Sequence, residues 1–244
     1  MKELHDVLAL SRDLHAKDIQ KADNYTVRRL RRIASLLGGK SVLDIGCGCG
    51  LLHSILGEEK VYVGIDFVKE SLSNEKWLGF PSAHKIIASA QALPIRDGSI
   101  HAVVCSEVLE HLPYDLPEKC LVEAFRTLDE GGSLTLSVPN FSHFVNRLYF
   151  LMRGRIRGLD DPLHVNFFSA ESLQRLLRKS GFGVIDRHGF DVILEPTNLL
   201  SRLASKFPYH LRMRIASLLP ILDQLIVLKV SRENPDEGSL PPSS

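Results

Sequence analysis

The sequence predicts an α/β protein in which a mainly parallel sheet carries helices on both faces. Short apolar segments typical of strands alternate with segments of helical periodicity through the middle of the chain, which requires crossover connections between parallel strands. The strand predicted at residues 41–45 runs directly into a glycine-rich turn. The 244 residues are 44% hydrophobic and 24% charged, as expected for one large domain with a buried core.

The first third of the chain contains the elements that surround this turn. Apolar residues recur every three or four positions within residues 5–37 and predict helices, which the glycine pair at 38 and 39 ends. Residues 41–45 form a short apolar strand. A helix is expected at residues 51–56 and a second strand at residues 61–66.

The middle of the chain continues this alternation. Apolar runs predict further strands at residues 85–89, 102–105 and 133–138. Helices are expected at residues 69–78, 107–112 and 117–128.

The last third of the chain changes character. Ser169 is a suitable N-cap for a helix with one leucine-rich face, and Gly181 ends that helix. Strands are predicted at residues 182–190 and 224–231. Residues 233–244 are polar and proline-rich, which predicts a disordered tail.

Charge and cysteine content exclude several classes of protein. Thirty basic and 29 acidic residues leave a formal charge of +1, so nothing indicates a general nucleic-acid binder. The four cysteines match neither a disulfide framework nor a zinc site, which favours a reducing, cytoplasmic location. No apolar run is long enough to span a membrane, and the charged beginning of the chain lacks the pattern of a signal peptide.

The segment Val42–Gly50, with the sequence VLDIGCGCG, carries most of the chemical information. Glycines after a strand let backbone amides approach a ligand closely, but their spacing does not fit the pattern of a dinucleotide site. Asp44 would repel a pyrophosphate and suits a ligand with a cationic group. Asp66 ends the second strand 22 positions further on, where a carboxylate can accept both hydroxyls of a ribose. Together these residues indicate an adenosyl ligand without phosphates.

With these residues the chain resembles the class I S-adenosylmethionine-dependent methyltransferases, of the small-molecule, type 11-like group. The resemblance covers about residues 38–190 and implies a Rossmann-like sheet of seven strands, the last one (224–231) antiparallel, plus helical cap elements. It rests on five segments in order, Val42–Gly50, Gly64–Asp66, Ala88–Pro94, Asp97–His111 and Gly131–Pro139.

The resemblance implies a role for each matching residue toward S-adenosyl-L-methionine. Asp44 lies near the ammonium group, Asp66 binds the ribose hydroxyls, and Phe67 lies against the adenine. Ser89 stands where the family often has an acid that accepts a hydrogen bond from the adenine amino group. The full set of expected cofactor-binding residues is Asp44, Gly46, Cys47, Gly48, Asp66, Phe67, Ala90, Gln91, Cys105 and Ser106.

Two histidines are the candidate catalytic residues. The sulfonium methyl group is already electrophilic, so the enzyme mainly has to hold the acceptor, methyl and sulfur atoms in line. A hydroxyl acceptor also has to lose its proton, and His111 and His164 are suitable bases because the pKa of histidine is near neutrality. Either histidine could instead only hydrogen-bond a loop or orient the acceptor.

A metal site is the alternative use of the same region. On a helix, Glu107, Glu110 and His111 would project from one face, and with His164 they could hold Mg²⁺ or Mn²⁺. The same pattern also suits a helix start at which acids complement the helix dipole. We assign no metal to the site that the sequence predicts.

Two insertions are expected to select the acceptor, at residues 141–158 and 196–222. Each contains four basic residues, several bulky apolar residues and no acid. This composition favours a small or lipid-linked acceptor, with an anionic group and transient contact with a membrane surface as further possibilities. An ordinary helical cap with a solvated basic face is the other interpretation. Residues 41–140 carry seven basic and fourteen acidic side chains, so the acidic part of the chain is the part assigned to the cationic cofactor.

These observations predict an enzyme that moves a methyl group in line to a small or lipid-linked acceptor, at oxygen. A metal-assisted methyltransferase of RNA ends and a non-catalytic relative that only binds the cofactor are the alternatives. The acceptor's identity and the oligomeric state do not follow from the sequence. The expected organisation is a helical lid (1–38), a cofactor-binding domain (39–195 and 223–232), a helical acceptor cap (196–222) and the tail (233–244).

Overall fold

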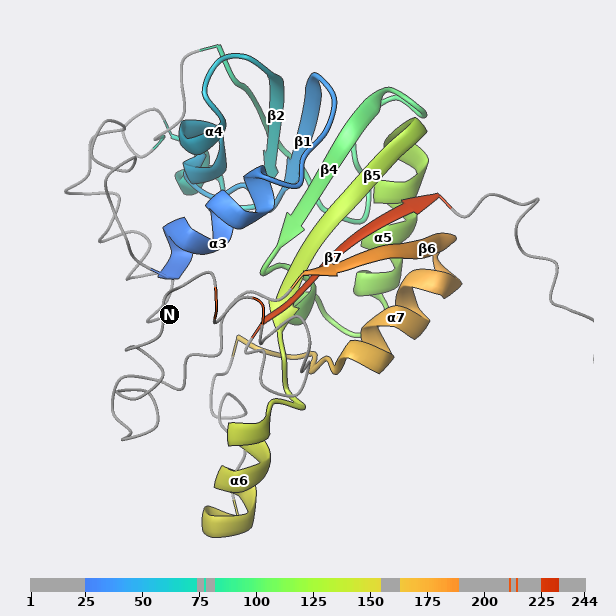
Figure 1. The fold of residues 1–244 in the computed structure, drawn as a ribbon. Coiled ribbons are helices and arrows are strands. Elements are labelled where there is room, and N and C mark those ends of the chain that lie inside the picture. Colours follow the sequence, from blue (N-terminus) through green and yellow to red (C-terminus); the bar gives the residue numbers. More distant parts are fainter. Residues whose placement is uncertain are drawn as a thin grey trace, which may run out of the picture.

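The computed structural model describes residues 25–73, 77, 82–154, 163–188, 211, 214 and 225–232. Figure 1 shows a twisted sheet with helices on both of its faces. Within the described residues the sheet has seven strands, in the order β3-β2-β1-β4-β5-β7-β6. The strands are β1 (Ser41–Ile45), β2 (Val61–Asp66), β3 (His84–Ile87), β4 (Ile100–Ser106), β5 (Leu128–Pro139), β6 (Phe182–His188) and β7 (Leu225–Arg232).

The strand directions confirm the predicted topology. The pairs β1–β2, β2–β3, β1–β4 and β4–β5 are parallel, whereas β7 lies antiparallel between β5 and β6. The chain builds outward from β1 first on one side and then on the other, so the strand order reverses between β1 and β4. Ligands of open α/β sheets bind beside the carboxyl ends of the strands at such a reversal.

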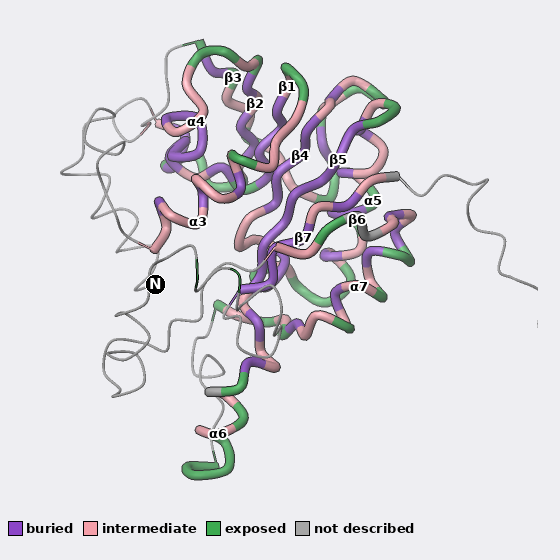
Figure 2. Tube along the Cα trace, viewed as in Figure 1, coloured by how far each residue is buried: buried purple, intermediate pink, exposed green. Residues whose placement is uncertain are grey.

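Helices cover the two faces of the sheet and bury two apolar layers. On one face α3 (Tyr25–Ala34) and α4 (Leu51–Leu56) pack against alternate side chains of β1, β2 and β4. On the other face α5 (Leu116–Thr127) and α7 (Ala170–Lys179) cover the larger core. Figure 2 shows these central strands buried along almost their whole length. Burial on both faces explains why the central strands are apolar without alternation.

The ends of the elements follow local sequence signals. Ser169 caps α7 as predicted, because its Oγ accepts a hydrogen bond from Ser172 N at 3.1 Å and Ser172 Oγ accepts one in return from Ser169 N. Gly181 follows with a φ of 90°. Helix α6 (Phe144–Arg153) lies in the first predicted insertion and extends away from the sheet in Figure 1.

Two predicted helices are corrected by the structure. Residues 107–112 contain only a short 3-10 turn, Leu109–His111, because Glu107 has a φ of 56° in the left-handed region and so cannot begin a helix. At residues 69–78 the structure shows a 3-10 turn over Lys69–Leu72, and residues 74–76 and 78 lie outside the described part of the chain.

Several expectations fall on residues that are not described. They are the helices before residue 25, most of the 196–222 cap and the 233–244 tail, so the proposed division into domains stays a prediction. Among the helices that the structure describes, none has the length and apolar character needed to cross a membrane.

Candidate functional site

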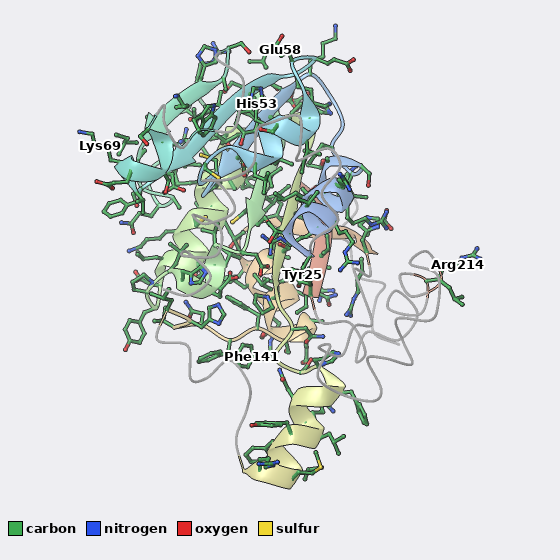
Figure 3. The ribbon with its side chains drawn as sticks, turned by 90° about the vertical axis from the view of Figure 1, so that its left-hand side faces the viewer. Tyr25, His53, Glu58, Lys69, Phe141 and Arg214 are labelled. Carbon is green, nitrogen blue, oxygen red and sulfur yellow. The ribbon has the colours of Figure 1, made fainter. Side chains whose placement is uncertain are left out.

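The candidate site lies at the carboxyl edge of the parallel strands. The glycine turn follows β1, Asp66 ends β2, Ser106 ends β4, and Asn140 follows β5. Because parallel strands end at the same edge of a sheet, residues that are far apart in the sequence meet here. In Figure 3, Phe141, which follows β5, lies between the sheet and α6.

The glycine turn is fixed by hydrogen bonds to β2 and by close packing. The amides of Gly46 and Cys47 both donate to Ile65 O, at 2.8 and 3.1 Å. Gly46 has a φ of 73°, and a Cβ there would lie 2.4 Å from Cγ2 of Val108, so this position requires glycine. Gly48 has a φ of 53°, and a Cβ there would meet nothing within 4 Å. Gly48 therefore presents bare backbone to open space, where a ligand can approach.

Asp66 connects this turn to the end of β2. Its Oδ2 accepts a hydrogen bond from Gly48 N at 2.8 Å, and its Oδ1 accepts one from Val68 N at 2.8 Å. Each carboxylate oxygen keeps a further acceptor position, so two hydroxyl groups can still bind. Phe67 follows directly with 79% of its surface exposed, so its ring is accessible to a planar group.

Asp44 is a buried carboxyl group with a perturbed pKa. Only 5% of its surface is exposed, and Tyr62 donates a hydrogen bond of 2.5 Å to its Oδ2. Burial raises the pKa of Asp44 to about 7, Asp66 adds to the rise, and the hydrogen bond from Tyr62 opposes it. The Asp44 carboxyl group therefore loses its proton near neutral pH, and its negative charge is available to a cation only above that range.

Sequence reasoning missed Tyr62. Its ring lies between two other rings, with centroid distances of 4.5 Å to His53 and 6.4 Å to Trp77. Asp44 pairs with Gly64 in the β1–β2 register, so Tyr62 lies two residues before Asp44's partner and on the same face. A correct prediction of the β1–β2 register from the sequence would have placed Tyr62 beside Asp44.

The remaining predicted cofactor residues lie near this edge in different surroundings. Ala90 is half-buried and Gln91 exposed in the loop after β3. The Cys47 side chain is buried beside Asp44 and Asp66, and burial raises its thiol pKa. Cys105 is fully buried and hydrogen-bonds Cys120 of α5, which raises its pKa. The Cys105 side chain therefore lies in the core, and only its backbone is placed to face a ligand.

Ser106 and Glu107 belong to a polar chain that leads to α3. The hydroxyl groups of Ser106 and Ser137 lie 2.9 Å apart, and Ser137 Oγ donates to Glu107 Oε1 at 3.2 Å. The other carboxylate oxygen of Glu107 pairs with Arg29 Nη1 at 3.3 Å. Glu107 therefore does not project from the same face as Glu110 and His111, and that expectation is wrong.

The structure brings the two predicted catalytic histidines together. Their rings lie 4.9 Å apart between centroids, and one ligand atom from each of Glu110, His111 and His164 lies within 4.8 Å of the others. His111 Nδ1 is 3.0 Å from Leu163 O, so it carries the proton in the neutral ring and leaves Nε2 as an acceptor. His164 Nδ1 has no hydrogen-bond partner within the described part of the chain.

Backbone hydrogen bonds hold this histidine pair in place. The amides of Val165 and Asn166 both donate to Glu110 O, at 2.9 and 3.0 Å. The side-chain amide of Asn166 also donates to the carbonyls of Leu109 and Leu112. The segment that carries His164 is therefore bound along the turn that carries His111.

This geometry matches a known family. A family model described as a methyltransferase domain matches residues 19–187, and the chain belongs to this family. This family match confirms the resemblance to S-adenosylmethionine-dependent methyltransferases.

Relatives of known name support the same class. The chain is 30% identical over 172 residues to a probable S-adenosylmethionine-dependent methyltransferase of Mycolicibacterium smegmatis, covering 68% of this chain and 63% of that protein. It is 27% identical over 183 residues to a ubiquinone biosynthesis O-methyltransferase of Chromobacterium violaceum, covering 71% of this chain and 77% of that protein. The chain spans less than two thirds of the length of the Mycolicibacterium smegmatis relative.

Solved structures show the same fold. A SAM-dependent methyltransferase from Archaeoglobus fulgidus superposes with a TM-score of 0.62 at 21% identity, covering 86% of this chain and 95% of that one. A possible histamine N-methyltransferase from Thermotoga maritima superposes with a TM-score of 0.60 at 20% identity, covering 85% of this chain and 88% of that one.

The residues at the carboxyl edge fit S-adenosylmethionine, the cofactor of this family. Gly48 leaves open space beside its backbone, Asp66 keeps acceptor positions for two hydroxyl groups, and Asp44 supplies a negative charge at the end of β1. No feature of the described residues selects a phosphate group here.

We expect Tyr62→Phe to shift the pH dependence of cofactor binding. Asp44 carries its charge only above its pKa of about 7, so affinity for the cofactor's ammonium group falls as pH falls through that value. Loss of the Tyr62 hydrogen bond removes an interaction that lowers this pKa, so the midpoint moves upward by about one unit.

Calorimetric titration with S-adenosylhomocysteine between pH 5.5 and 8.5 measures this midpoint. Tyr114→Phe is the matched control, because Tyr114 is 94% exposed. Asp44→Asn, which cannot titrate, is expected to remove the dependence. An unchanged midpoint in Tyr62→Phe would show that Tyr62 does not control the charge of Asp44.

Proposed function

We propose that this enzyme transfers the methyl group of S-adenosylmethionine to an oxygen atom of a small, lipid-linked acceptor. The pairing of His111 and His164 beside the cofactor edge is the observation that carries the proposal, since transfer to a hydroxyl group requires a base. The relatives named as ubiquinone biosynthesis O-methyltransferases support an oxygen acceptor of this kind.

The protein's own groups perform three tasks in this proposal. The bound cofactor supplies an electrophilic methyl group on a sulfonium. Asp44 and the backbone of Gly46 and Gly48 hold its amino-acid part, and Asp66 holds the ribose. Phe67, Ala90 and Gln91 border the adenine, whereas Cys47, Cys105 and Ser106 shape the floor beneath the cofactor.

His111 removes the acceptor's proton in this mechanism. Its Nδ1 is directed to the Leu163 carbonyl, which leaves the Nε2 lone pair able to accept a proton. The His164 ring lies alongside that of His111. In this mechanism His164 either holds the His111 ring in position or orients the acceptor hydroxyl group.

The surroundings of the acceptor follow from the sequence and are part of the proposal. From the sequence, we propose residues 1–38 as a lid and residues 196–222 as a cap. An anionic acceptor suits the basic insertions, and the four cysteines, free and buried, suit a reducing cytoplasm.

Incubation of the enzyme with methyl-labelled cofactor and fractionated cell extract tests the proposal. We expect label in the lipid fraction and a decrease in kcat of ~10²–10⁴-fold in His111→Gln. His84→Gln, an exposed change at the start of β3, is the matched control. Label only in RNA would support the RNA-end alternative, and no label in any fraction would support a non-catalytic relative.

A second candidate, metal-assisted transfer, is favoured by the cluster of Glu110, His111 and His164. The cluster offers one carboxylate, because Glu107 faces Arg29 and Ser137 instead. Mg²⁺ prefers oxygen ligands, so this set suits it poorly.

We therefore expect no saturable heat when Mg²⁺ is titrated into the protein, and Mn²⁺, which accepts imidazole ligands, is titrated as the stricter test. The proposed imidazole base needs no metal, so a chelator is expected to leave methyl transfer unchanged. Glu110→Gln is the matched variant. A saturable heat that disappears in Glu110→Gln would favour the metal-assisted mechanism over the imidazole base.

A further inference from the structure

The end of α6 exposes three large apolar side chains in succession. Phe150, Leu151 and Met152 are 51%, 80% and 65% exposed, and Arg153 follows them. We infer that this α6 tip, residues 150–154, docks on an anionic lipid bilayer. The inference rests on the proposed function, because it explains where the enzyme meets a lipid-linked acceptor.

Packing against the described part of the chain does not cover these side chains. No α6 residue with a described side chain is buried, and Figure 2 shows the tip exposed where the helix extends away from the sheet. Large apolar groups that remain together in water mark sites of interaction. A tip of this kind can insert its apolar side chains among lipid chains while the rest of the helix stays near the headgroups.

The charges select an anionic surface. Arg147 and Arg153 lie on α6, and Arg155 and Arg157 follow in the sequence. Residues 141–158 contain no acid, and the first acids that follow them in the sequence are Asp160 and Asp161. Basic residues beside an apolar segment are attracted to anionic headgroups. A symmetric contact between two copies would instead place the same positive charges opposite each other.

A pocket at α6 lies near the segment that carries His164. A cavity of about 260 Å³ is lined by Phe141, Asn146, Arg147, Phe150 and Leu151. The Phe141 ring lies 4.3 Å from that of Phe167, three residues after His164. An apolar chain that enters this cavity from a bilayer would therefore lie beside the segment that carries His164.

Flotation of the full chain with vesicles tests the inference. At low salt we expect the protein to float with vesicles of phosphatidylcholine and phosphatidylglycerol, and at least tenfold less with phosphatidylcholine alone. The double variant Leu151→Asp/Met152→Asp is expected to reduce the bound fraction at least tenfold. Val122→Asp is the matched control, because Val122 is 48% exposed on α5.

A second pair of variants tests the charge contribution. Arg153→Glu is expected to weaken vesicle binding severalfold, whereas Arg175→Glu, an exposed change on α7, leaves it unchanged. Protein that stays wholly unbound, or a double variant that floats like the wild type, would overturn the inference. Loss of a dimer in the double variant would assign the tip to a second copy instead.

Two further measurements separate this inference from the proposed function. Calorimetric binding of S-adenosylhomocysteine shows that each variant keeps the folded cofactor site. Methyl transfer to the lipid fraction without vesicle binding would overturn the docking surface alone. Vesicle binding without any methyl transfer would overturn the proposed function alone.

Discussion

The hydrogen bond from the Gly48 amide to the Asp66 carboxylate is the interaction on which the site depends. At 2.8 Å it joins the turn after β1 to the end of β2, and the amides of Gly46 and Cys47 bind the same strand end through Ile65 O. The turn can come this close because its glycines adopt positive φ values and lack side chains. One carboxylate thereby fixes the loop and keeps free acceptor positions for a ligand.

Acidic and basic side chains lie on different segments at the carboxyl edge of the sheet. The cofactor side contains Asp44 and Asp66, which suit a cationic ligand, whereas the insertion after β5 is basic. His164 of the histidine pair lies on the segment that also contacts Phe141, just before α6. In the proposed reaction a cationic cofactor gives its methyl group to an acceptor that approaches from the basic insertion. Acidic residues on the cofactor side and basic residues on the acceptor side suit that arrangement.

The sequence was sufficient for much of the fold and for the residues of the glycine turn. Apolar strands that alternate with helices predicted the strands of the sheet, and the resemblance supplied the antiparallel position of β7. Glu107 was placed wrongly on a helix face, because its left-handed backbone and its contacts with Arg29 and Ser137 do not follow from the local sequence. Tyr62 was missed because its role depends on strand register. The pairing of His111 with His164 required knowledge of how the segment 163–168 returns to the sheet.

The most direct test of this account is the affinity of S-adenosylhomocysteine for the wild type and for Asp66→Asn, measured by calorimetry at pH 8. If Asp66 holds the ribose, loss of its charge weakens charge-assisted hydrogen bonds of ~1.5–3 kcal/mol each and lowers affinity by at least about tenfold. Asp115→Asn, at an exposed aspartate, is expected to bind like the wild type. Equal affinity in the wild type and Asp66→Asn would contradict the assignment of the cofactor to this edge of the sheet.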